Sequence, residues 1–499
     1  MPRVRRITLE DLYQRRWELL ALTSVGAFMA PLDGSIVSVA LPVLSPDLGL
    51  SFAASMWVQA AYLLVMAVLL IPVGRLADHF GRVRFYLMGI MIFTIGSGLA
   101  GASPGGSWLI ASRIVQGVGG AFLAATAAAI VAAVFPPHER GRALGVNVMA
   151  VYIGLSVGPP LGGFLTGHLG WRWIFLVNIP IGILVFVWGW LLLPRRERQS
   201  AAMLRMDFAG AVLLGSFLVC LLVPLTFASQ WGWTRAATVT LLSLSAASLA
   251  GFIAVELRAA NPVLDLTLLV CNRLFAAANT AALLNYVALS AIAVLTAVYL
   301  EVVQGRSPML AGWLLLSQPA MMAVLSPLSG RLSDTVGSRV LTTGGMVLLA
   351  GGMVLLASLS ADAGVSRVMM ALALAGVGMA CFSAPNSSAI FGSVGRRQLG
   401  LASAFLATVR VTGQALSIAV LGGIAAHALG PVGGRLLFSH GAGAQGSVNR
   451  TAEVVADYVL GYRAAMFTGA ALAVVGALVS LVRGPASPRA GALPRDRRA

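Results

Sequence analysis

The sequence predicts an all-α polytopic membrane protein with fourteen transmembrane helices, and three observations support this. Of the 499 residues, 58% are hydrophobic and only 10% are charged, whereas soluble domains carry about 25% charged residues. Apolar stretches of the roughly 20 residues needed to cross a bilayer recur along the whole chain. Basic residues concentrate in every second connection between these stretches. An ordinary soluble enzyme and a disordered chain are thereby excluded.

Fourteen apolar segments follow one another along the chain. They begin near Trp17, Met56, Arg84, Ser107, Arg142, Arg172, Asp207, Arg235, Arg273, Ala311, Val340, Arg367, Leu401 and Arg463. They predict a tail (1–16), a six-helix half (17–194), a loop (195–206), two inserted helices (207–257), a second six-helix half (258–483) and a tail (484–499). A long external connection is expected at 428–462, Gly-rich at first and then amphipathic from Thr451 to Tyr462, lying on the membrane surface.

The net charge of +17 is explained by topology. All 34 basic residues are arginine; 25 fall on the side of the termini, 7 fall on the opposite side, and Arg113 and Arg410 lie within helices. The positive-inside rule therefore places both termini in the cytoplasm, and no nucleic-acid partner is needed to explain the charge. The heavy use of Ala, Gly and Arg is typical of a GC-rich bacterial genome, so we expect a multi-pass protein of the bacterial plasma membrane.

Two motifs recur at nearly the same offset, which indicates a duplication. The run from Gly74 to Gly81 (GRLADHFG) returns 256 residues later as the run from Gly330 to Gly337 (GRLSDTVG). The run GVGGA from Gly117 returns 259 residues later as GVGMA from Gly376. A parallel repeat of two six-helix halves is an architecture in which a substrate binds near the membrane midplane between the halves.

Five motifs resemble the major facilitator superfamily, and specifically its fourteen-helix drug:proton antiporters. They are LDGSIVSVALP from Leu32, GRLADHFGRVR from Gly74, RIVQGVGGA from Arg113, GLSVGPPLGG from Gly154, and WRWIF from Trp171 with NIP from Asn178. The resemblance implies export of amphipathic compounds in exchange for protons. It also implies alternating access, with the proton gradient as the energy source and with no cofactor.

Asp33 and Arg113 are the candidate proton-coupling residues. From the expected helix ends, both lie at a depth of roughly 20 Å from the cytoplasmic side, where an unpaired charge costs several kcal/mol. A carboxylate that alternately meets arginine and water can change its protonation, which would release Arg113 and permit the conformational switch. The alternative is a structural ion pair between the first and fourth helices.

Further polar residues within the spans are candidates for a substrate cavity, or alternatively for hydrogen bonds between helices. They are Gln59, Tyr62, Gln116, Asn285, Glu301, Gln318, Asn386, Arg410 and Gln414. Arg410 is either structural or faces an anionic ligand. Glu301 is either a solvated rim residue or a second proton or cation contact.

The repeated loop motif and the glycines of the fifth helix are candidates for gating. In the loop, Asp78 is expected to satisfy a helix N-terminus across the interface between the halves and so latch the cytoplasmic side in the outward-open state. In the fifth helix, small residues allow close approach of backbones and prolines bend the helix. The gating residues are Gly74, Asp78, Gly81, Arg82, Gly154, Gly158, Pro159, Gly162, Gly163, Gly330, Asp334, Gly337 and Arg339.

The sequence therefore predicts a monomeric proton-coupled antiporter, embedded in the lipid bilayer, that exports drugs, dyes or a toxic metabolite. A proton-coupled uptake symporter remains an alternative, as does a lipid-handling or sensory protein that kept the fold. An enzyme is not expected, because no convergent nucleophile, base or metal cluster is evident. The chain has no Gly-x-x-x-x-Gly-Lys-[Ser/Thr] motif that would indicate an ATP-driven pump.

Overall fold

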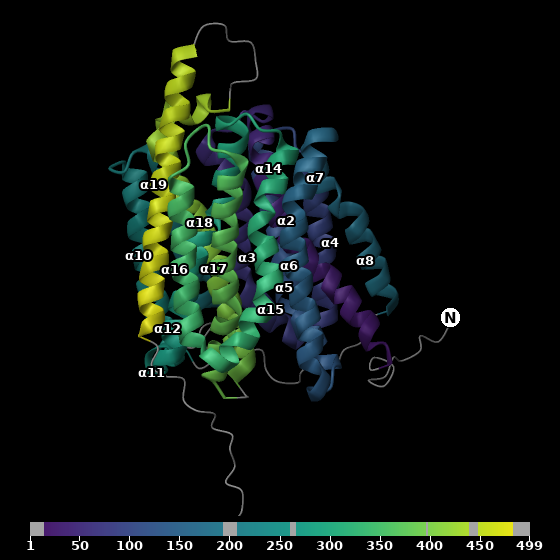
Figure 1. The fold of residues 1–499 in the computed structure, drawn as a ribbon. Helices are drawn as coiled ribbons and strands as arrows, with labels where there is room; N and C mark the ends of the chain where they lie inside the picture. Colours follow the sequence, from purple (N-terminus) through teal and green to yellow (C-terminus); the bar gives the residue numbers. More distant parts are fainter. Residues whose placement is uncertain (1–13, 193–206, 260–265, 396–397, 439–447, 483–499) are drawn as a thin grey trace, which may run out of the picture.

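The computed structural model describes residues 14–192, 207–259, 266–395, 398–438 and 448–482, and they form a bundle of long helices (Figure 1). The first half contains α2 (Arg16–Asp47), α3 (Phe52–Phe80), α4 (Arg82–Gly101), α5 (Gly106–Val134), α6 (Pro137–His168), α7 (Trp173–Leu176) and α8 (Asn178–Leu192). The inserted helices are α9 (Phe208–Trp231) and α10 (Ala236–Glu256).

The second half begins with short pieces and continues with long helices. It contains α11 (Leu266–Cys271), α12 (Arg273–Leu289), α13 (Ala291–Val298), the π-helix η1 (Tyr299–Val303), α14 (Pro308–Leu315), α15 (Ser317–Val336), α16 (Ser338–Ala357), α17 (Val365–Gly392), α18 (Leu399–Leu436) and α19 (Val448–Leu481). Within the described residues, fourteen helical spans are long and apolar enough to cross a membrane, as predicted. The chain is a multi-pass membrane protein.

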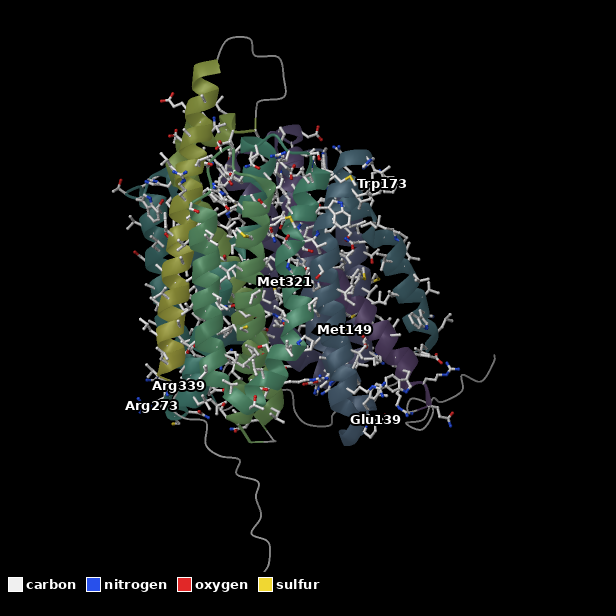
Figure 2. The ribbon with its side chains drawn as sticks, viewed as in Figure 1. Glu139, Met149, Trp173, Arg273, Met321 and Arg339 are labelled. Carbon is white, nitrogen blue, oxygen red and sulfur yellow. The ribbon has the colours of Figure 1, made fainter. Side chains whose placement is uncertain are left out.

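The two ends of the described chain lie at the same end of the bundle, where α2 begins and α19 ends (Figure 1). We call this the terminal end, and the opposite end the distal end. Glu139, Arg273 and Arg339 lie at the terminal end and Trp173 at the distal end, with Met149 and Met321 between them (Figure 2). The predicted tails and the loop 195–206 fall outside the described residues, apart from residues 14–16.

Matching glycine contacts show that the two halves repeat the same packing. Gly89 of α4 packs against the carbonyl oxygen of Gly119 on α5, and Gly345 of α16 packs in the same way against Gly378 on α17. Gly345 follows Gly89 by 256 residues and Gly378 follows Gly119 by 259 residues, which are the offsets of the two repeated sequence motifs. A side chain at these positions would meet backbone atoms, so glycine is what allows each helix pair to approach closely.

The turns between the second and third spans of each half also match. Gly81 has φ 112° and Gly337 has φ 92°, a region of backbone conformation that strongly favours glycine. Each turn links two spans that run in opposite directions through the bundle. The duplication predicted from the sequence therefore extends to backbone geometry.

The first inserted helix, α9, covers one edge of the seam between the halves. Trp57 of α3, in the first half, stacks on Phe227 of α9 with ring centroids 5.8 Å apart. A methyl group on Gly423 of α18, in the second half, would lie 2.5 Å from the carbonyl oxygen of Leu225 on α9. Helix α9 thus contacts both halves at once.

The predicted connection at 428–462 is corrected by the structure. Helix α18 continues to Leu436, with a kink at Gly430 (φ 62°), and the last span begins at Ala452 rather than near Arg463. The segment Thr451–Tyr462 does not lie on the membrane surface. Its tyrosines are buried: the Tyr458 hydroxyl donates to Leu295 O at 2.7 Å, and the Tyr462 hydroxyl bonds Thr296 Oγ1 at 3.2 Å.

Candidate functional site

The centre of the first half holds a buried polar network around Asp33. Arg113 Nη1 lies 2.5 Å from Asp33 Oδ2, and both side chains are 0% exposed. Gln116 Nε2 donates to Asp33 Oδ1 at 2.7 Å and to Ser97 Oγ at 2.8 Å. Asn178 Nδ2 also donates to Asp33 Oδ1, at 3.2 Å. Helices α2, α5 and α8 therefore meet at one carboxylate, and α4 joins the network through Ser97 and Gln116.

The guanidinium of Arg113 is held on several sides. Its Nη1 also donates to Gln116 Oε1, and its Nε donates to Val58 O of α3 at 2.9 Å. The ring of Tyr62 lies 4.4 Å from its central carbon and the ring of Phe175 lies 5.7 Å away. Its Nη2 has no hydrogen-bond partner although it is buried. This arrangement fits a charge-assisted pair that is shielded from lipid by aromatic faces.

The second half keeps the packing of this region but not its charges. Gly96 packs on Gln116 in the first half, and Gly352 packs on Ala375 at the equivalent place in the second. Arg113 lies three residues before Gln116, and Leu372 lies three residues before Ala375. Leu372 is therefore the second-half equivalent of Arg113. The fold itself therefore does not require an arginine at this depth.

The equivalent of Asp33 is also apolar. Gly154 of α6 packs against Phe28 O, and Gly413 of α18 packs against Leu283 O. These contacts make Phe28 and Leu283 equivalent on the first helix of each half. Asp33 lies five residues after Phe28 and Ala288 lies five residues after Leu283, so Ala288 is the equivalent of Asp33.

The predicted cavity residues separate into two groups. Gln59, Tyr62 and Gln116 lie beside Asp33: Gln59 Nε2 donates to Gly34 O at 3.0 Å, and the Tyr62 hydroxyl lies 3.5 Å from Ala30 O. The others lie in the second half. Asn285 is buried within that half, where its Nδ2 contacts Met346 Sδ at 3.1 Å. Gln318 and Asn386 are buried, whereas Glu301, Arg410 and Gln414 are half-buried.

A second polar cluster crosses the seam between the halves, and the sequence analysis found only one of its members, Arg410. Tyr152 of α6 bonds Ser383 of α17, with 3.1 Å between their hydroxyl oxygens. Tyr286 of α12 lies close enough to Ser383, Tyr152 and Arg410 of α18 to interact electrostatically with them. All four side chains retain accessible surface. We call these four residues the seam cluster.

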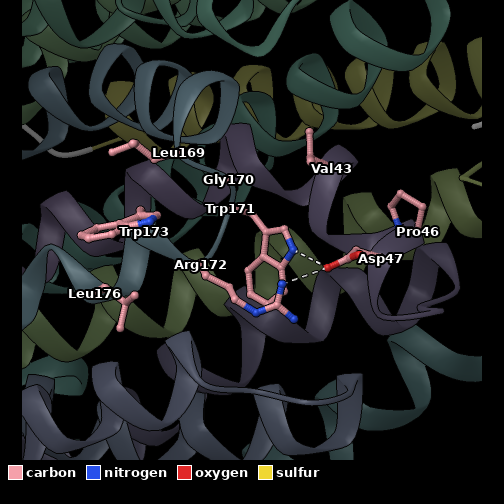
Figure 3. A pocket seen from close by; sticks show the side chains of 9 residues that line it. All are labelled: Val43, Pro46, Asp47, Leu169, Gly170, Trp171, Arg172, Trp173 and Leu176. Carbon is pink, nitrogen blue, oxygen red and sulfur yellow. Dashed lines mark hydrogen bonds and ion pairs between the residues drawn. The ribbon is translucent and has the colours of Figure 1, made fainter.

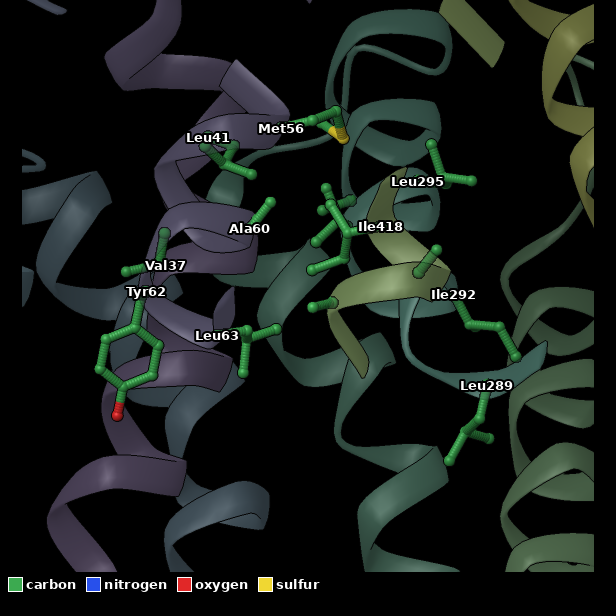
Figure 4. Close-up of a cluster of buried hydrophobic side chains, with 14 of the residues drawn as sticks. Val37, Leu41, Met56, Ala60, Tyr62, Leu63, Leu289, Ile292, Leu295 and Ile418 are labelled. Atoms are coloured by element: carbon green, nitrogen blue, oxygen red, sulfur yellow. The ribbon is translucent and has the colours of Figure 1, made fainter. Parts of the chain in front are cut away.

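Above the seam cluster, apolar side chains close the distal part of the seam. Val37, Leu41, Met56, Ala60 and Leu63 of the first half face Leu289, Ile292, Leu295 and Ile418 of the second, with the Tyr62 hydroxyl pointing away from them (Figure 4). All are buried. Water and ions are therefore excluded from this part of the seam.

Helices α6 and α14 cross at the distal end. A methyl group on Gly163 would lie 2.3 Å from Pro308 O, and one on Gly312 would lie 2.2 Å from Pro159 O. The two halves therefore touch backbone to backbone here. By contrast, Gly154, Gly158 and Gly162 pack against α2 within the first half, so Gly163 alone of these four gating candidates contacts the other half.

The loop motif does not form the predicted latch in this conformation. Asp78 Oδ1 accepts from Arg82 Nε at 2.6 Å, and Arg82 Nη1 donates to Ala129 O of α5 at 3.0 Å. Both partners belong to the first half. In the repeat, Gly330 packs near Ala384 and Arg339 is exposed, whereas the side chain of Asp334 lies outside those described.

A pocket of about 510 Å³ opens at the distal end (Figure 3). Asp47 Oδ2 accepts from Trp171 Nε1 at 2.7 Å and from Arg172 Nη1 at 3.2 Å, and the Arg172 guanidinium lies 4.3 Å from the Trp171 ring. These bonds fasten the end of α2 to the connection after α6. Asp47 lies 14 residues from Asp33, about 21 Å along the helix, so this pocket is separate from the buried network.

Comparison with known proteins agrees with this architecture. Residues 23–410 match the Major Facilitator Superfamily. The chain is 34% identical over 421 residues to the riboflavin transporter RibZ of Clostridioides difficile (strain 630), covering 83% of this chain and 90% of that protein. It is 31% identical over 420 residues to the tetracenomycin C resistance and export protein of Streptomyces glaucescens, covering 84% and 77%.

Solved structures support the fold. A bacterial homologue of the human lysosomal transporter Spinster, in an inward-facing and occupied conformation, superposes with a TM-score of 0.66 at 18% identity, covering 94% of this chain and 96% of that one. The multidrug resistance protein Stp of Mycobacterium tuberculosis (strain CDC 1551 / Oshkosh) is 34% identical over 414 residues, covering 82% and 76%. The chain belongs to the major facilitator superfamily and is a plasma-membrane transporter rather than an enzyme.

Proposed function

We propose that this transporter is a proton-coupled antiporter that exports amphipathic small molecules by alternating access, with Asp33 as the proton-binding group. The observation that carries this proposal is the buried Asp33–Arg113 pair, whose equivalents in the second half are Ala288 and Leu372. A buried ion pair often stabilises a protein no better than apolar residues of similar volume. Charges kept in one half of a duplicated fold therefore favour a functional role.

The geometry suggests how a proton would act. Ionised Asp33 accepts bonds from α5 and α8, through Arg113, Gln116 and Asn178. A proton on the carboxyl removes the charge that holds Arg113 and turns one acceptor oxygen into a donor. The contacts of α2 with α5 and α8 would then weaken together, which lets the first half change its packing.

The conformation described is closed at the distal end, by the α6–α14 crossing and the apolar seam. We place the terminal end in the cytoplasm, because 25 of the 34 arginines fall on that side. Substrate would then enter the seam from the cytoplasm and leave when the distal crossing opens. Relatives named for multidrug resistance, tetracenomycin C and puromycin support export of drug-like molecules.

The first experiment measures accumulation of anionic, neutral and cationic dyes in energised cells, with and without a protonophore. We expect less accumulation of at least one dye in cells with the wild type than with empty vector, and loss of the difference with the protonophore. Asp33→Asn should abolish export, whereas Asp47→Asn, the other aspartate on α2, should retain most of it. Export by Asp33→Asn that still depends on the gradient would reject Asp33 as the proton site.

Proton-coupled uptake is the second candidate, because a relative at 34% identity is named as a riboflavin transporter. The same cells distinguish the two directions. Higher internal riboflavin or dye in energised wild-type cells than in vector cells would indicate uptake, and lower internal dye would indicate export.

A further inference from the structure

We propose that the seam cluster binds anionic aromatic molecules, with Arg410 pairing with a carboxylate or an acidic phenol of the substrate. This inference rests on the proposed function, because it names the chemical class of the molecule that the transporter carries. It depends on three features of the cluster: an uncompensated arginine, two tyrosines from opposite halves, and the location of the acidic groups.

Arg410 is a membrane-embedded arginine without a counter-charge. It lies 9 residues into the span Leu401–Leu436, about 14 Å from its terminal end. No carboxylate of the described residues lies within 4.0 Å of its guanidinium, whereas the membrane-embedded Arg113 is paired with Asp33. A charged side chain at such depth is costly unless it is paired or hydrated. An anionic ligand would supply the missing partner.

The surroundings of Arg410 suit a flat ring. Tyr152 and Tyr286 come from opposite halves, and Ser383, which bonds Tyr152, also interacts with Tyr286. Their side chains and that of Arg410 are all half-buried, so each can contact a molecule in the seam. Two tyrosine rings offer apolar faces with hydroxyl groups that donate to an oxygen-rich ligand. Gln414, one helical turn beyond Arg410, adds a further polar group on the same face.

Asp33 and Glu301, the acidic residues predicted as proton or cation contacts, are poorly placed to hold a cation in this seam. Asp33 is enclosed by Arg113, Gln116 and Asn178 and is 0% exposed. Glu301 lies 15 residues beyond Tyr286 on the span Arg273–Val303, about 22 Å toward the distal end. A cationic molecule at the seam cluster would therefore meet the charge of Arg410, with neither Asp33 nor Glu301 placed to pair with it. The electrostatics select an anion.

The test uses two dyes with the same xanthene ring and opposite charge, fluorescein and rhodamine 6G. Binding of each to the purified full-length protein in detergent is measured by fluorescence polarisation at pH 7.5. We expect the wild type to bind fluorescein at least about tenfold more tightly than rhodamine 6G, as charge-assisted hydrogen bonds allow. Arg410→Gln should lose this preference and Arg410→Lys should keep part of it. Arg435→Gln, which changes an exposed arginine on the same helix, should retain it.

Three results would overturn the proposal: equal or tighter binding of rhodamine 6G, no binding of fluorescein by the wild type, or an unchanged preference in Arg410→Gln. The wild-type comparison of the two dyes is informative even if a variant fails to fold. Tight fluorescein binding without any gradient-dependent transport would reject the proposed function and leave the anion site intact. Proton-driven export of cationic dyes by a protein that does not bind fluorescein would reject the anion site alone.

Discussion

The carboxylate of Asp33 and the guanidinium of Arg113 form a fully buried ion pair, and the duplicated second half has Ala288 and Leu372 at the equivalent positions. The helices around these positions pack in the same way in both halves, down to matching glycine contacts. The pair therefore stands out as a charged feature added to a repeat that folds without it. This contrast makes the contribution of the pair to stability separable from its contribution to transport.

Replacing the pair by its second-half equivalents should preserve the fold and abolish coupling. Arg113→Leu alone leaves Asp33 buried without its counter-charge and should cost about 3–5 kcal/mol of unfolding free energy. The double variant Asp33→Ala/Arg113→Leu should recover most of that loss, yet show no gradient-driven transport. Thermal unfolding in detergent and transport in vesicles measure the two properties. A double variant as unstable as Arg113→Leu would show that the pair is needed for folding.

We expect Asn178 to stabilise the protein through its hydrogen bond to Asp33. Asn178→Leu removes the donor 3.2 Å from Asp33 Oδ1, and leaving a buried acceptor with fewer partners costs about 1–3 kcal/mol. In the Asp33→Ala/Arg113→Leu background the same change should cost less than about 0.5 kcal/mol, because no carboxylate remains to be satisfied. Denaturation of the four proteins gives the coupling energy. Equal costs in both backgrounds would mean that Asn178 acts on something other than Asp33.

Gly158 and Gly167 on α6 form a matched pair for testing helix packing. A methyl group on Gly158 would lie 1.8 Å from Ser35 Oγ, whereas one on Gly167 would meet nothing within 4 Å. We expect Gly158→Ala to destabilise the protein by about 1–3 kcal/mol and Gly167→Ala to leave its stability nearly unchanged. If both variants unfold at the same temperature as the wild type, α2 and α6 do not pack as described.

The distal crossing should open during transport. A Cβ on Gly163 would lie 2.3 Å from Pro308 O and 2.9 Å from Met309 Cα, so Gly163→Val should hold α6 and α14 apart and prevent the crossing from closing again. Because alternating access needs both the open and the closed state, Gly163→Val should lose gradient-driven dye transport in vesicles. Gly167→Val, on the same helix with nothing within 4 Å of its Cβ, should retain transport. Full transport by Gly163→Val would show that the transport cycle does not need this crossing to close.

The sequence predicts the number and order of the helices well because composition and arginine distribution act over whole spans. It also predicts that Asp33 and Arg113 meet, since their expected depths agree. The predicted start of the last span, near Arg463, is too late, because an amphipathic segment looks the same whether it buries Tyr458 and Tyr462 in protein or lies on a membrane. Only tertiary contacts decide between these two outcomes.

The seam cluster is harder to predict. Tyr152, Tyr286 and Ser383 are common residues in apolar spans, and nothing local in the sequence indicates that they face one another across the halves. Arg410 can be recognised from the sequence because it is a charged residue within an apolar span. Its surroundings, however, depend on which faces of α6, α12 and α17 meet α18. The loop motif presents the same difficulty, because the partners of Asp78 and Arg82 depend on the conformation.

Gradient-driven efflux from proteoliposomes tests the central claim most directly. Vesicles containing the purified protein are loaded with a dye that the wild type exports, and efflux is followed with and without an imposed pH gradient. The wild type and Asp47→Asn should accelerate efflux when the compartment receiving the dye is acidic, and Asp33→Asn should be indifferent to the gradient. Gradient-driven efflux by Asp33→Asn at the wild-type rate would contradict the assignment of Asp33 as the proton-binding group.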